Sequence, residues 1–410
     1  MRVYFKTFGC RTNLFDTQIM INRLKDFTLT QNEDEADIVV VNSCTVTNGA
    51  DGSVRNYINK INKKNKKIYL TGCGAFTKGE DLFSQKKVAG VFGHSEKEKV
   101  NELLKRENFF ELGDLNHVDK EIVTEFIGKS RAFIKVQEGC DFRCSYCIIP
   151  FVRGNARSLD EELIVKQVQI LAANGFGEFI LTGTNVGSYG KDSGTSLAKL
   201  LKRLSLVRGV RRLRLGSIEP IQIDDEFMEI LNEPWMAKHL HIALQHTSQK
   251  MLDIMNRRNR LEEDLRLFES IASKGYAIGT DFIVGHPGES EEIFEEALKN
   301  LTKFPLTHIH PFTYSKRDGT PSASMKGEVR GDVAKERLKR VKTLIEKKNL
   351  DFRSKKGPLA VLVESKKDGL YFGYDQYFNP AFIKSDLDLE GNWVEISDYK
   401  VEKRGNFATL

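Results

Sequence analysis

The chain has 410 residues, 40% of them hydrophobic and 29% charged, and its formal net charge is +6. This length predicts two to three domains, and the composition supplies enough apolar residues for a sizeable core. No apolar run reaches the ~18 residues that a transmembrane helix needs, and Met1–Phe8 lacks the apolar stretch of a signal peptide. We therefore expect a cytoplasmic protein without a membrane partner. The mild basicity permits nucleic-acid binding.

The first predicted domain, residues 1–115, alternates strand-like and helix-like segments. Val39, Val40 and Val41 form the continuous apolar run that is typical of a strand buried in a parallel sheet. The strand-like segments are 2–10, 36–44 and 67–73, and the helix-like segments between them are 16–26 and 52–63. This order predicts a βαβαβ unit, that is, an open parallel sheet with crossover helices.

Each of these three strands is followed by a cysteine, namely Cys10, Cys44 and Cys73. The carboxyl ends of parallel strands meet at one edge of an open sheet, so the three thiols are expected to lie together although they are distant in sequence. A single buried cysteine at such a place would be ordinary. Three at the same topological position favour a metal cluster with three protein ligands and one open metal ion.

The second predicted domain, residues 123–349, repeats the same strand–helix rhythm. Its strand-like segments are 132–137, 178–183, 212–219, 239–245, 277–285 and 308–314. Six such units predict an incomplete parallel β/α barrel, in which reactive groups lie at the carboxyl ends of the strands. The alternating histidines on two of these strands are interpreted as sheet-face or barrel-mouth residues and not as ligands.

Cys140, Cys144 and Cys147 follow the first strand of this domain in a C-x3-C-x2-C spacing. Three thiolates so close in sequence can hold three irons of one iron–sulfur cluster and leave the fourth iron open for chemistry. A zinc site and three unrelated buried thiols are the alternatives. The spacing resembles the signature of the radical S-adenosylmethionine (radical-SAM) enzymes. In that family the open iron binds S-adenosylmethionine, and one electron from the cluster yields a 5′-deoxyadenosyl radical.

Polar residues and glycines at the strand ends are candidates for binding S-adenosylmethionine. Glu219 offers a carboxylate to an amine or a ribose hydroxyl, and Gln245 offers an amide to a carboxylate. Glycines allow close approach to the backbone. For each candidate, a helix cap, an ordinary loop or simple packing is the alternative. The candidate set is Tyr146, Gly183, Asn185, Ser217, Glu219, Gln245 and Gly285.

The third predicted domain, residues 354–410, follows a basic helix that begins after Arg330. That helix presents either a solvated face or lysines and arginines for phosphate contact. Beyond Gly357-Pro358 the pattern changes to short strands, which predicts a small β-barrel. The predicted strands are 359–364, 370–374, 381–384 and 392–396.

Two three-cysteine sites in one chain narrow the choice of family, and the whole chain resembles the radical-SAM methylthiotransferases. Asn42–Asn48, with the sequence Asn-Ser-Cys-Thr-Val-Thr-Asn, is similar to a segment of the MtaB branch of that family. Met255–Arg258, Asp281–Gly285 and Tyr314–Ala323 also resemble that branch. The resemblance implies an α/β fold with an N-terminal βαβ open-sheet domain, a central radical-SAM partial (β/α)6 barrel and a small C-terminal all-β TRAM-like barrel.

The same resemblance implies the cofactors and the reaction. The cofactors would be S-adenosylmethionine and two 4Fe-4S clusters, one held by Cys10, Cys44 and Cys73 and the other by Cys140, Cys144 and Cys147. The enzyme would act on the anticodon loop of tRNA and convert N6-threonylcarbamoyladenosine at position 37 to its 2-methylthio derivative. The electron donor and the sulfur donor are left open.

Two alternatives to this function stay open at the level of sequence. The first is a methylthiotransferase that acts on a different tRNA adenosine or on a ribosomal protein. The second is a zinc-stabilised RNA-binding protein without catalysis. The second would be colourless, whereas an iron–sulfur protein is brown.

Overall fold

The computed structural model describes residues 1–126 and 129–410. Its N-terminal part is a six-stranded sheet with the order β2-β1-β3-β4-β5-β6, and every pairing between neighbouring strands is parallel. The strands are β1 (Arg2–Thr7), β2 (Thr28–Leu29), β3 (Ile38–Ser43), β4 (Lys67–Gly72), β5 (Gly90–Phe92) and β6 (Phe109–Glu111). The helices are α1 (Arg11–Arg23), α2 (Asn48–Asn62), α3 (Ala75–Ser84) and α4 (Val100–Leu103).

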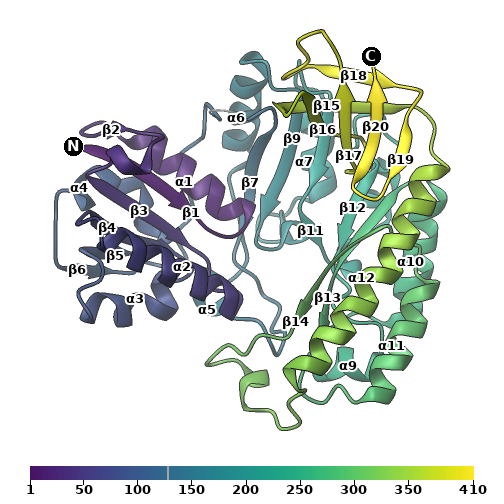
Figure 1. Cartoon of the computed structure of the whole chain (residues 1–410), viewed down its shortest axis with the longest axis horizontal. Coiled ribbons are helices and arrows are strands. Elements are labelled where there is room, and N and C mark those ends of the chain that lie inside the picture. The colour runs from purple at the N-terminus through teal and green to yellow at the C-terminus, as the bar shows by residue number, and fades with distance from the viewer. Residues whose placement is uncertain (127–128) are drawn as a thin grey trace.

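The central part is a partial barrel built from two sheet segments, β10-β9-β7-β8 and β11-β12-β13-β14, that are joined by a parallel bridge between Leu213 and Met236 (Figure 1). Six of its strands run parallel, namely β7 (Ala132–Glu138), β9 (Glu178–Gly183), β10 (Arg212–Leu215), β12 (His239–Ile242), β13 (Ala277–Val284) and β14 (His308–Thr313). The two short strands are β8 (Arg157–Ser158) and β11 (Ser217–Ile218).

Amphipathic helices connect these strands and cover the outside of the barrel. In α6, for example, Ile164, Val168 and Leu171 are buried at helical spacing, and Asp160 caps the first turn by accepting a hydrogen bond from the Leu163 amide. The helices are α5 (Ile149–Arg153), α6 (Glu161–Ala173), α7 (Leu197–Ser205), α8 (Asp225–Ile230), α9 (Gln249–Ile254), α10 (Leu261–Ser273), α11 (Glu291–Lys303) and α12 (Gly331–Ser354).

The C-terminal part is a curled six-stranded sheet with the order β18-β15-β16-β17-β20-β19. Arg212 and Arg214 of the barrel fasten it, because they donate hydrogen bonds to the carbonyls of Ala360 and Asp375 at 2.9 and 3.1 Å while both pair with buried Glu178. The strands are β15 (Leu359–Lys367), β16 (Leu370–Tyr374), β17 (Pro380–Lys384), β18 (Trp393–Ile396), β19 (Lys400–Glu402) and β20 (Gly405–Thr409).

The predicted fold class is confirmed: an N-terminal parallel sheet, a radical-SAM-type partial barrel and a C-terminal all-β unit follow one another. The structure adds strands that the sequence analysis did not predict, namely β2, β5 and β6 in the first sheet, β8 in the barrel, and β19 and β20 in the last sheet. Helix α12 begins at Gly331, directly after Arg330, as expected. Among the helices of the described residues, none combines the length and the apolar character that crossing a bilayer requires.

Helix α1 joins the N-terminal sheet to the barrel. Its residues Phe15 and Ile19, both 1% exposed, belong to the same hydrophobic core as Ile134 and Val136 of β7 and Ile180 of β9. The first helix after a predicted cluster cysteine therefore packs directly on the strand that leads to the second cysteine set. Figure 1 shows α1 between the two parts, next to β7.

Candidate active site

The three N-terminal cysteines lie at one edge of the first sheet. Thr7 of β1 pairs with Asn42, and Ser43 of β3 pairs with Gly72, so the three strands end at the same level. Cys10 is the residue before α1, and Cys44 and Cys73 follow β3 and β4. Cys10 is exposed, whereas Cys44 and Cys73 are buried, and none of the three forms a disulfide.

The chemistry and spacing of this site fit a metal cluster. Gly9 has a φ of +98°, and a Cβ atom there would lie 2.9 Å from the Cys44 Sγ, so only glycine leaves the thiol free space. Burial raises the pKa of Cys44 to about 11; the neighbouring Cys73 and Cys10 contribute to this rise, and a hydrogen bond from the Val46 backbone opposes it. Iron ions would take the place of the protons on such thiols. Three free thiols, with the space that Gly9 leaves beside the Cys44 sulfur, are a suitable donor set for three irons.

The second cysteine set lies in the loop between β7 and α5. The Cys140 amide donates a hydrogen bond to the Gly154 carbonyl at 3.0 Å, and the Cys147 amide donates one to the Cys144 carbonyl at 3.0 Å. Ser145 anchors the middle of the loop, because its amide donates to the Met255 carbonyl at 2.9 Å and its carbonyl accepts from the Ser322 amide at 2.8 Å. The loop is thus held by hydrogen bonds to Met255–Arg258 and Tyr314–Ala323, two of the segments that resemble the MtaB branch.

Two polar side chains direct N–H groups at the sulfurs of this loop. The Asn185 side-chain amide donates to Cys140 Sγ at 3.6 Å, and the Arg257 guanidinium donates to Cys144 Sγ at 3.6 Å. Hydrogen bonds of this kind stabilise negatively charged sulfur and orient metal ligands. The donor set therefore fits an iron–sulfur cluster at Cys140, Cys144 and Cys147. Asn185 was among the predicted cofactor-binding residues, whereas Arg257 was noted only as part of the Met255–Arg258 resemblance.

The Glu219 carboxylate is held by Arg257. Both Glu219 oxygens accept hydrogen bonds from this guanidinium, one of them at 2.9 Å, and Arg257 also donates to the Ala243 carbonyl at 2.5 Å. Burial opposes the positive charge of Arg257, but Glu219 outweighs it and the pKa of the guanidinium lies above its ordinary value. Glu219 thus lies in the neighbourhood of Cys144, with its charge paired by Arg257; its contact with S-adenosylmethionine stays a prediction.

A cavity of about 330 Å³ brings the two halves of the site together. Gln245, held in the left-handed region with a φ of +66°, lies in its wall together with Tyr146 and Cys147. Val46 and Thr47, which follow Cys44 closely in the chain, also line this cavity. The remaining lining residues are Ile148, Ile149, Asp281, Ile283, Phe312, Thr313, Tyr314 and Ser315. Residues next to both cysteine sets therefore border one cavity.

The other predicted cofactor contacts have other close neighbours. A Cβ atom on Gly183 would lie 2.7 Å from the Gln137 carbonyl oxygen of β7, and one on Gly285 would lie 2.7 Å from Ala334 of α12. Both glycines are thus required for packing between elements. Ser217 is exposed in β11. Contact of these three residues with S-adenosylmethionine stays a prediction.

Asp281 lies between two histidines on the barrel strands, an arrangement that the sequence analysis did not predict. Its Oδ1 is 3.2 Å from His241 Nε2 and 3.5 Å from His310 Nδ1. Burial disfavours the ionised carboxylate, but His241 and then His310 outweigh it and hold the pKa of Asp281 below its ordinary value. Because Asp281 lines the cavity, it presents a charged hydrogen-bond acceptor there.

The segment after Cys44 is clamped by the segment after β14. Arg317 donates to the Thr45 carbonyl at 2.9 Å and to the Asp51 carboxylate at 2.6 Å, and it also donates to the Asn48 side chain. The Asn48 amide donates to Ser315 Oγ at 2.8 Å. Two segments that resemble the MtaB branch, separated by more than 260 residues in sequence, therefore lie in contact.

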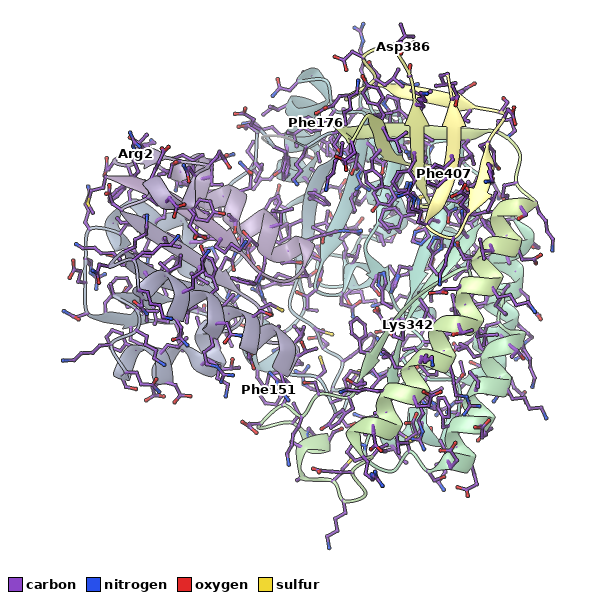
Figure 2. The ribbon with its side chains drawn as sticks, in the orientation of Figure 1. Arg2, Phe151, Phe176, Lys342, Asp386 and Phe407 are labelled. Carbon is purple, nitrogen blue, oxygen red and sulfur yellow. The ribbon has the colours of Figure 1, made fainter. Side chains whose placement is uncertain are left out.

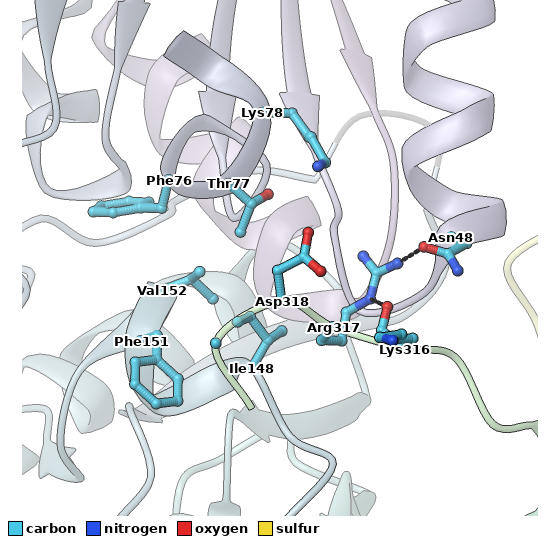
Figure 3. Close-up of a pocket in the computed structure, with 11 residues that line it drawn as sticks. Asn48, Phe76, Thr77, Lys78, Ile148, Phe151, Val152, Lys316, Arg317 and Asp318 are labelled. Atoms are coloured by element: carbon cyan, nitrogen blue, oxygen red, sulfur yellow. Dashed lines mark hydrogen bonds between the residues drawn. The ribbon is translucent and has the colours of Figure 1, made fainter. Parts of the chain in front are cut away.

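A second cavity, of about 440 Å³, lies beside this clamp, because Asn48 and Arg317 are among its lining residues (Figure 3). Phe76 and Lys78 of α3 form one wall, Phe151 of α5 forms another, and Lys316 and Asp318 lie along the loop that closes it. Phe151 is 54% exposed although it is a large apolar residue, and Figure 2 shows it where the N-terminal part faces the barrel. The cavity combines aromatic faces with cations.

Comparison with known proteins identifies the family. Residues 2–93 match the family model described as "Uncharacterized protein family UPF0004", and residues 134–301 match the "Radical SAM superfamily". A Helicobacter pylori strain J99 protein whose name places it provisionally among the methylthiotransferases is 55% identical, with 100% of each chain covered. The Aquifex aeolicus "Threonylcarbamoyladenosine tRNA methylthiotransferase MtaB" is 38% identical over 87% of this chain and 90% of its own length.

A solved structure is similar in fold. The radical S-adenosylmethionine methyltransferase TsrM from Kitasatospora setae, solved with cobalamin and a [4Fe-4S] cluster bound, matches with a TM-score of 0.61, 16% sequence identity and coverage of 78% of this chain and 77% of that chain. Its fold agrees with the radical-SAM match over 134–301, and the Helicobacter pylori relative also aligns with residues 2–93, which carry the N-terminal cysteines. The chain therefore belongs to the radical-SAM methylthiotransferases, and within them to the MtaB type.

Proposed function

We propose that this enzyme converts N6-threonylcarbamoyladenosine at position 37 of tRNA to its 2-methylthio derivative, and that it contacts the anticodon loop. The observation that supports this proposal most is the cavity of about 330 Å³, which is lined both by Cys147 and by Val46 and Thr47, just after Cys44. The names of the MtaB relatives supply the substrate. The proposed domains are residues 1–115, 123–349 and 354–410.

The residues proposed to hold the two clusters are the cysteines of each set, Cys10, Cys44 and Cys73 and then Cys140, Cys144 and Cys147. When bound, the clusters and S-adenosylmethionine supply the one-electron and sulfur-transfer chemistry that the C2–H bond of adenine requires. The protein residues supply placement. Asn185 and Arg257 direct N–H groups at two of the sulfurs, and so fix the loop on which the reaction depends.

The larger mixed cavity is the proposed site for a nucleotide beside the target adenosine. A base that is to be modified must leave the stack of its loop, and the neighbouring bases then need new surfaces. Phe76 and Phe151 offer aromatic faces for such a base, and Lys78 and Lys316 lie where a backbone phosphate would be neutralised. The target adenosine would occupy the cavity near Cys147, which shares the lining residue Ile148 with the larger cavity.

The direct test is mass spectrometry of tRNA nucleosides from a strain that lacks this gene. We expect N6-threonylcarbamoyladenosine to persist and its 2-methylthio derivative to vanish, with recovery on complementation by the wild-type gene. Loss of a different 2-methylthio nucleoside would show that the enzyme modifies another tRNA adenosine and not the proposed one. Unchanged tRNA together with a mass change in a ribosomal protein would contradict a tRNA substrate altogether.

The double variant Lys78→Ala/Lys316→Ala should bind tRNA more weakly and with less dependence on salt. Each phosphate neutralised in a single-stranded loop contributes roughly 0.7 to the slope of log affinity against log salt, so the loss of two contacts should reduce that slope by about 1.4. Filter binding at several salt concentrations measures it. The control variant Lys299→Ala/Lys303→Ala removes two exposed lysines from α11 and should leave the slope unchanged. If the two double variants have the same salt slope, tRNA does not contact Lys78 and Lys316, and the proposed nucleotide site is wrong.

A further inference from the structure

Arg153 is a buried arginine that joins the two cysteine sites. It is the last residue of α5, the helix that follows Cys147, and it is 2% exposed. Its Nε donates to Cys73 Sγ at 3.2 Å, its Nη2 donates to Asn13 Oδ1 at 2.5 Å, and its Nη1 donates to Asp16 Oδ2 at 2.8 Å. All three nitrogens of one guanidinium therefore contact the N-terminal part of the chain.

The same guanidinium also reaches the strand before the second cysteine set. Arg153 Nη1 donates to the carboxylate of Glu138, the last residue of β7, which lies two positions before Cys140. Glu138 is 1% exposed. Within the described residues, Arg153 thus has one hydrogen bond to a predicted ligand of the first cluster and one to the strand end that carries the second.

Asn13 extends this link to all three N-terminal cysteine loops. Its side-chain amide donates to the Phe8 carbonyl and to the Ser43 carbonyl, both at 2.9 Å. Phe8 lies two residues before Cys10, and Ser43 directly precedes Cys44. Because its amide nitrogen is used in this way, the Asn13 oxygen is left to accept from Arg153. One arginine–asparagine pair consequently holds the loops of Cys10 and Cys44 and the sulfur of Cys73.

A cationic N–H donor on a cluster sulfur has a defined chemical effect. It stabilises the more negative, reduced state of the cluster relative to the oxidised state, and hydrogen bonds to sulfur are one of the factors that set cluster potentials. The contact is buried, where a charge-assisted hydrogen bond is strongest. Asn185 and Arg257 give the second cysteine set comparable donors, but neither of them reaches across to the first set in the contacts described above.

We propose that Arg153 is a positioning residue for the proposed reaction: it fixes the N-terminal cluster against the radical-SAM cluster and raises the reduction potential of the cluster that Cys73 helps to hold. The proposal depends on the proposed function only in taking Cys73 as a cluster ligand. The contact comes from α5, which directly follows the loop that carries Cys140, Cys144 and Cys147. One side chain therefore couples the position of that loop to the reduction potential of the N-terminal cluster.

The test compares Arg153→Met with Arg157→Met in full-length protein in which Cys140, Cys144 and Cys147 are replaced by Ala, so that only the N-terminal cluster contributes. Arg157 is a matched control, because it is also buried and also lies near Glu138, at 3.4 Å, while its hydrogen bonds go to backbone carbonyls and not to a cysteine. Iron content and the midpoint potential from an EPR-monitored redox titration are measured without tRNA.

We expect Arg153→Met to retain the cluster with a midpoint potential shifted downward, and Arg157→Met to keep the parent potential. Equal potentials in the parent and Arg153→Met would overturn the proposal. If Arg153→Met binds no iron, Arg153→Lys decides the matter: bound iron with a shifted potential supports the proposal, and bound iron with the parent potential overturns it. Failure of the proposed function would appear separately, as unchanged tRNA nucleosides in the deletion strain or as full iron retention in Cys73→Ala.

Discussion

Replacing Cys140, Cys144 and Cys147 together with Ala should abolish the methylthio product and halve the iron content. Each [4Fe-4S] cluster accounts for four irons, so anaerobically purified wild-type protein should contain about eight irons per chain and the variant about four. One loop carries the three thiols that we propose as ligands, and Asn185 and Arg257 direct hydrogen bonds at two of them. Iron and sulfide analysis, absorption spectra and nucleoside mass spectrometry measure the effects.

The matched control replaces Cys10, Cys44 and Cys73 with Ala. This variant should also lose about four irons and all methylthio product, but it should still cleave S-adenosylmethionine to 5′-deoxyadenosine, because the other cluster is intact. The two variants thus separate radical generation from sulfur transfer. Zinc without iron or sulfide in the wild-type protein, even after anaerobic reconstitution, would contradict both expectations and return the chain to the zinc RNA-binding alternative.

Both cysteine sites could be predicted from the sequence because each follows from a local pattern. The C-x3-C-x2-C spacing lies within eight residues, and the N-terminal cysteines each follow a run of strand-forming residues. The parallel register that pairs Ser43 with Gly72 then brings Cys44 and Cys73 to the same edge of the sheet. Their role as cluster ligands stays a prediction that the iron analysis tests.

Most of the strands that were missed are very short; the exception is β20, whose five residues carry one large apolar side chain, Phe407, and so give no alternating pattern. β2 has two residues, and β5, β6 and β19 have three each, which is too short for a period-two pattern to be visible. Lys400–Glu402 also carries two charged residues, which are rare in strand interiors. Such strands exist because a neighbouring strand supplies the hydrogen bonds, and that neighbour is distant in sequence.

The charged residues around the two sites could not be placed from the sequence. Lys, Asp, Glu and Arg are rarely fully buried, so the sequence gives no sign that Lys135 and Arg153 lie in the interior. Their partner Asp16 lies 119 residues before Lys135 and 137 residues before Arg153, and no periodicity relates them. Contact of Glu219 with S-adenosylmethionine stays a prediction, and its pairing with Arg257, 38 residues away, needed the structure.

Lys135→Met should destabilise the contact between the N-terminal sheet and the barrel more than any surface charge change. Lys135 is 1% exposed, and its Nζ is 2.6 Å from Asp16 Oδ1 and 3.4 Å from Glu138 Oε2, with Asp119 as a third carboxylate partner. Burial opposes its charge, but Asp119, Asp16 and Glu138 outweigh this and raise the pKa of Lys135. Without this cation the three buried carboxylates are incompletely neutralised. In comparable cases such a loss lowers the free energy of unfolding by about 3–5 kcal/mol.

Urea unfolding followed by circular dichroism measures the loss, and Lys60→Met is the control. Lys60 also pairs with a carboxylate, that of Glu33 at 2.9 Å, but its side chain is 59% exposed, so its replacement should change the free energy of unfolding by less than about 1 kcal/mol. The double variant Lys135→Met/Asp119→Asn should recover part of the loss, because one uncompensated charge is removed with the cation. Equal stability of Lys135→Met and Lys60→Met would mean that water or rearrangement relieves the buried charges. In that case the buried ion pairs of Lys135 would not be the interaction that holds α1 against β7. They would then also not fix the position of Cys10, which precedes α1.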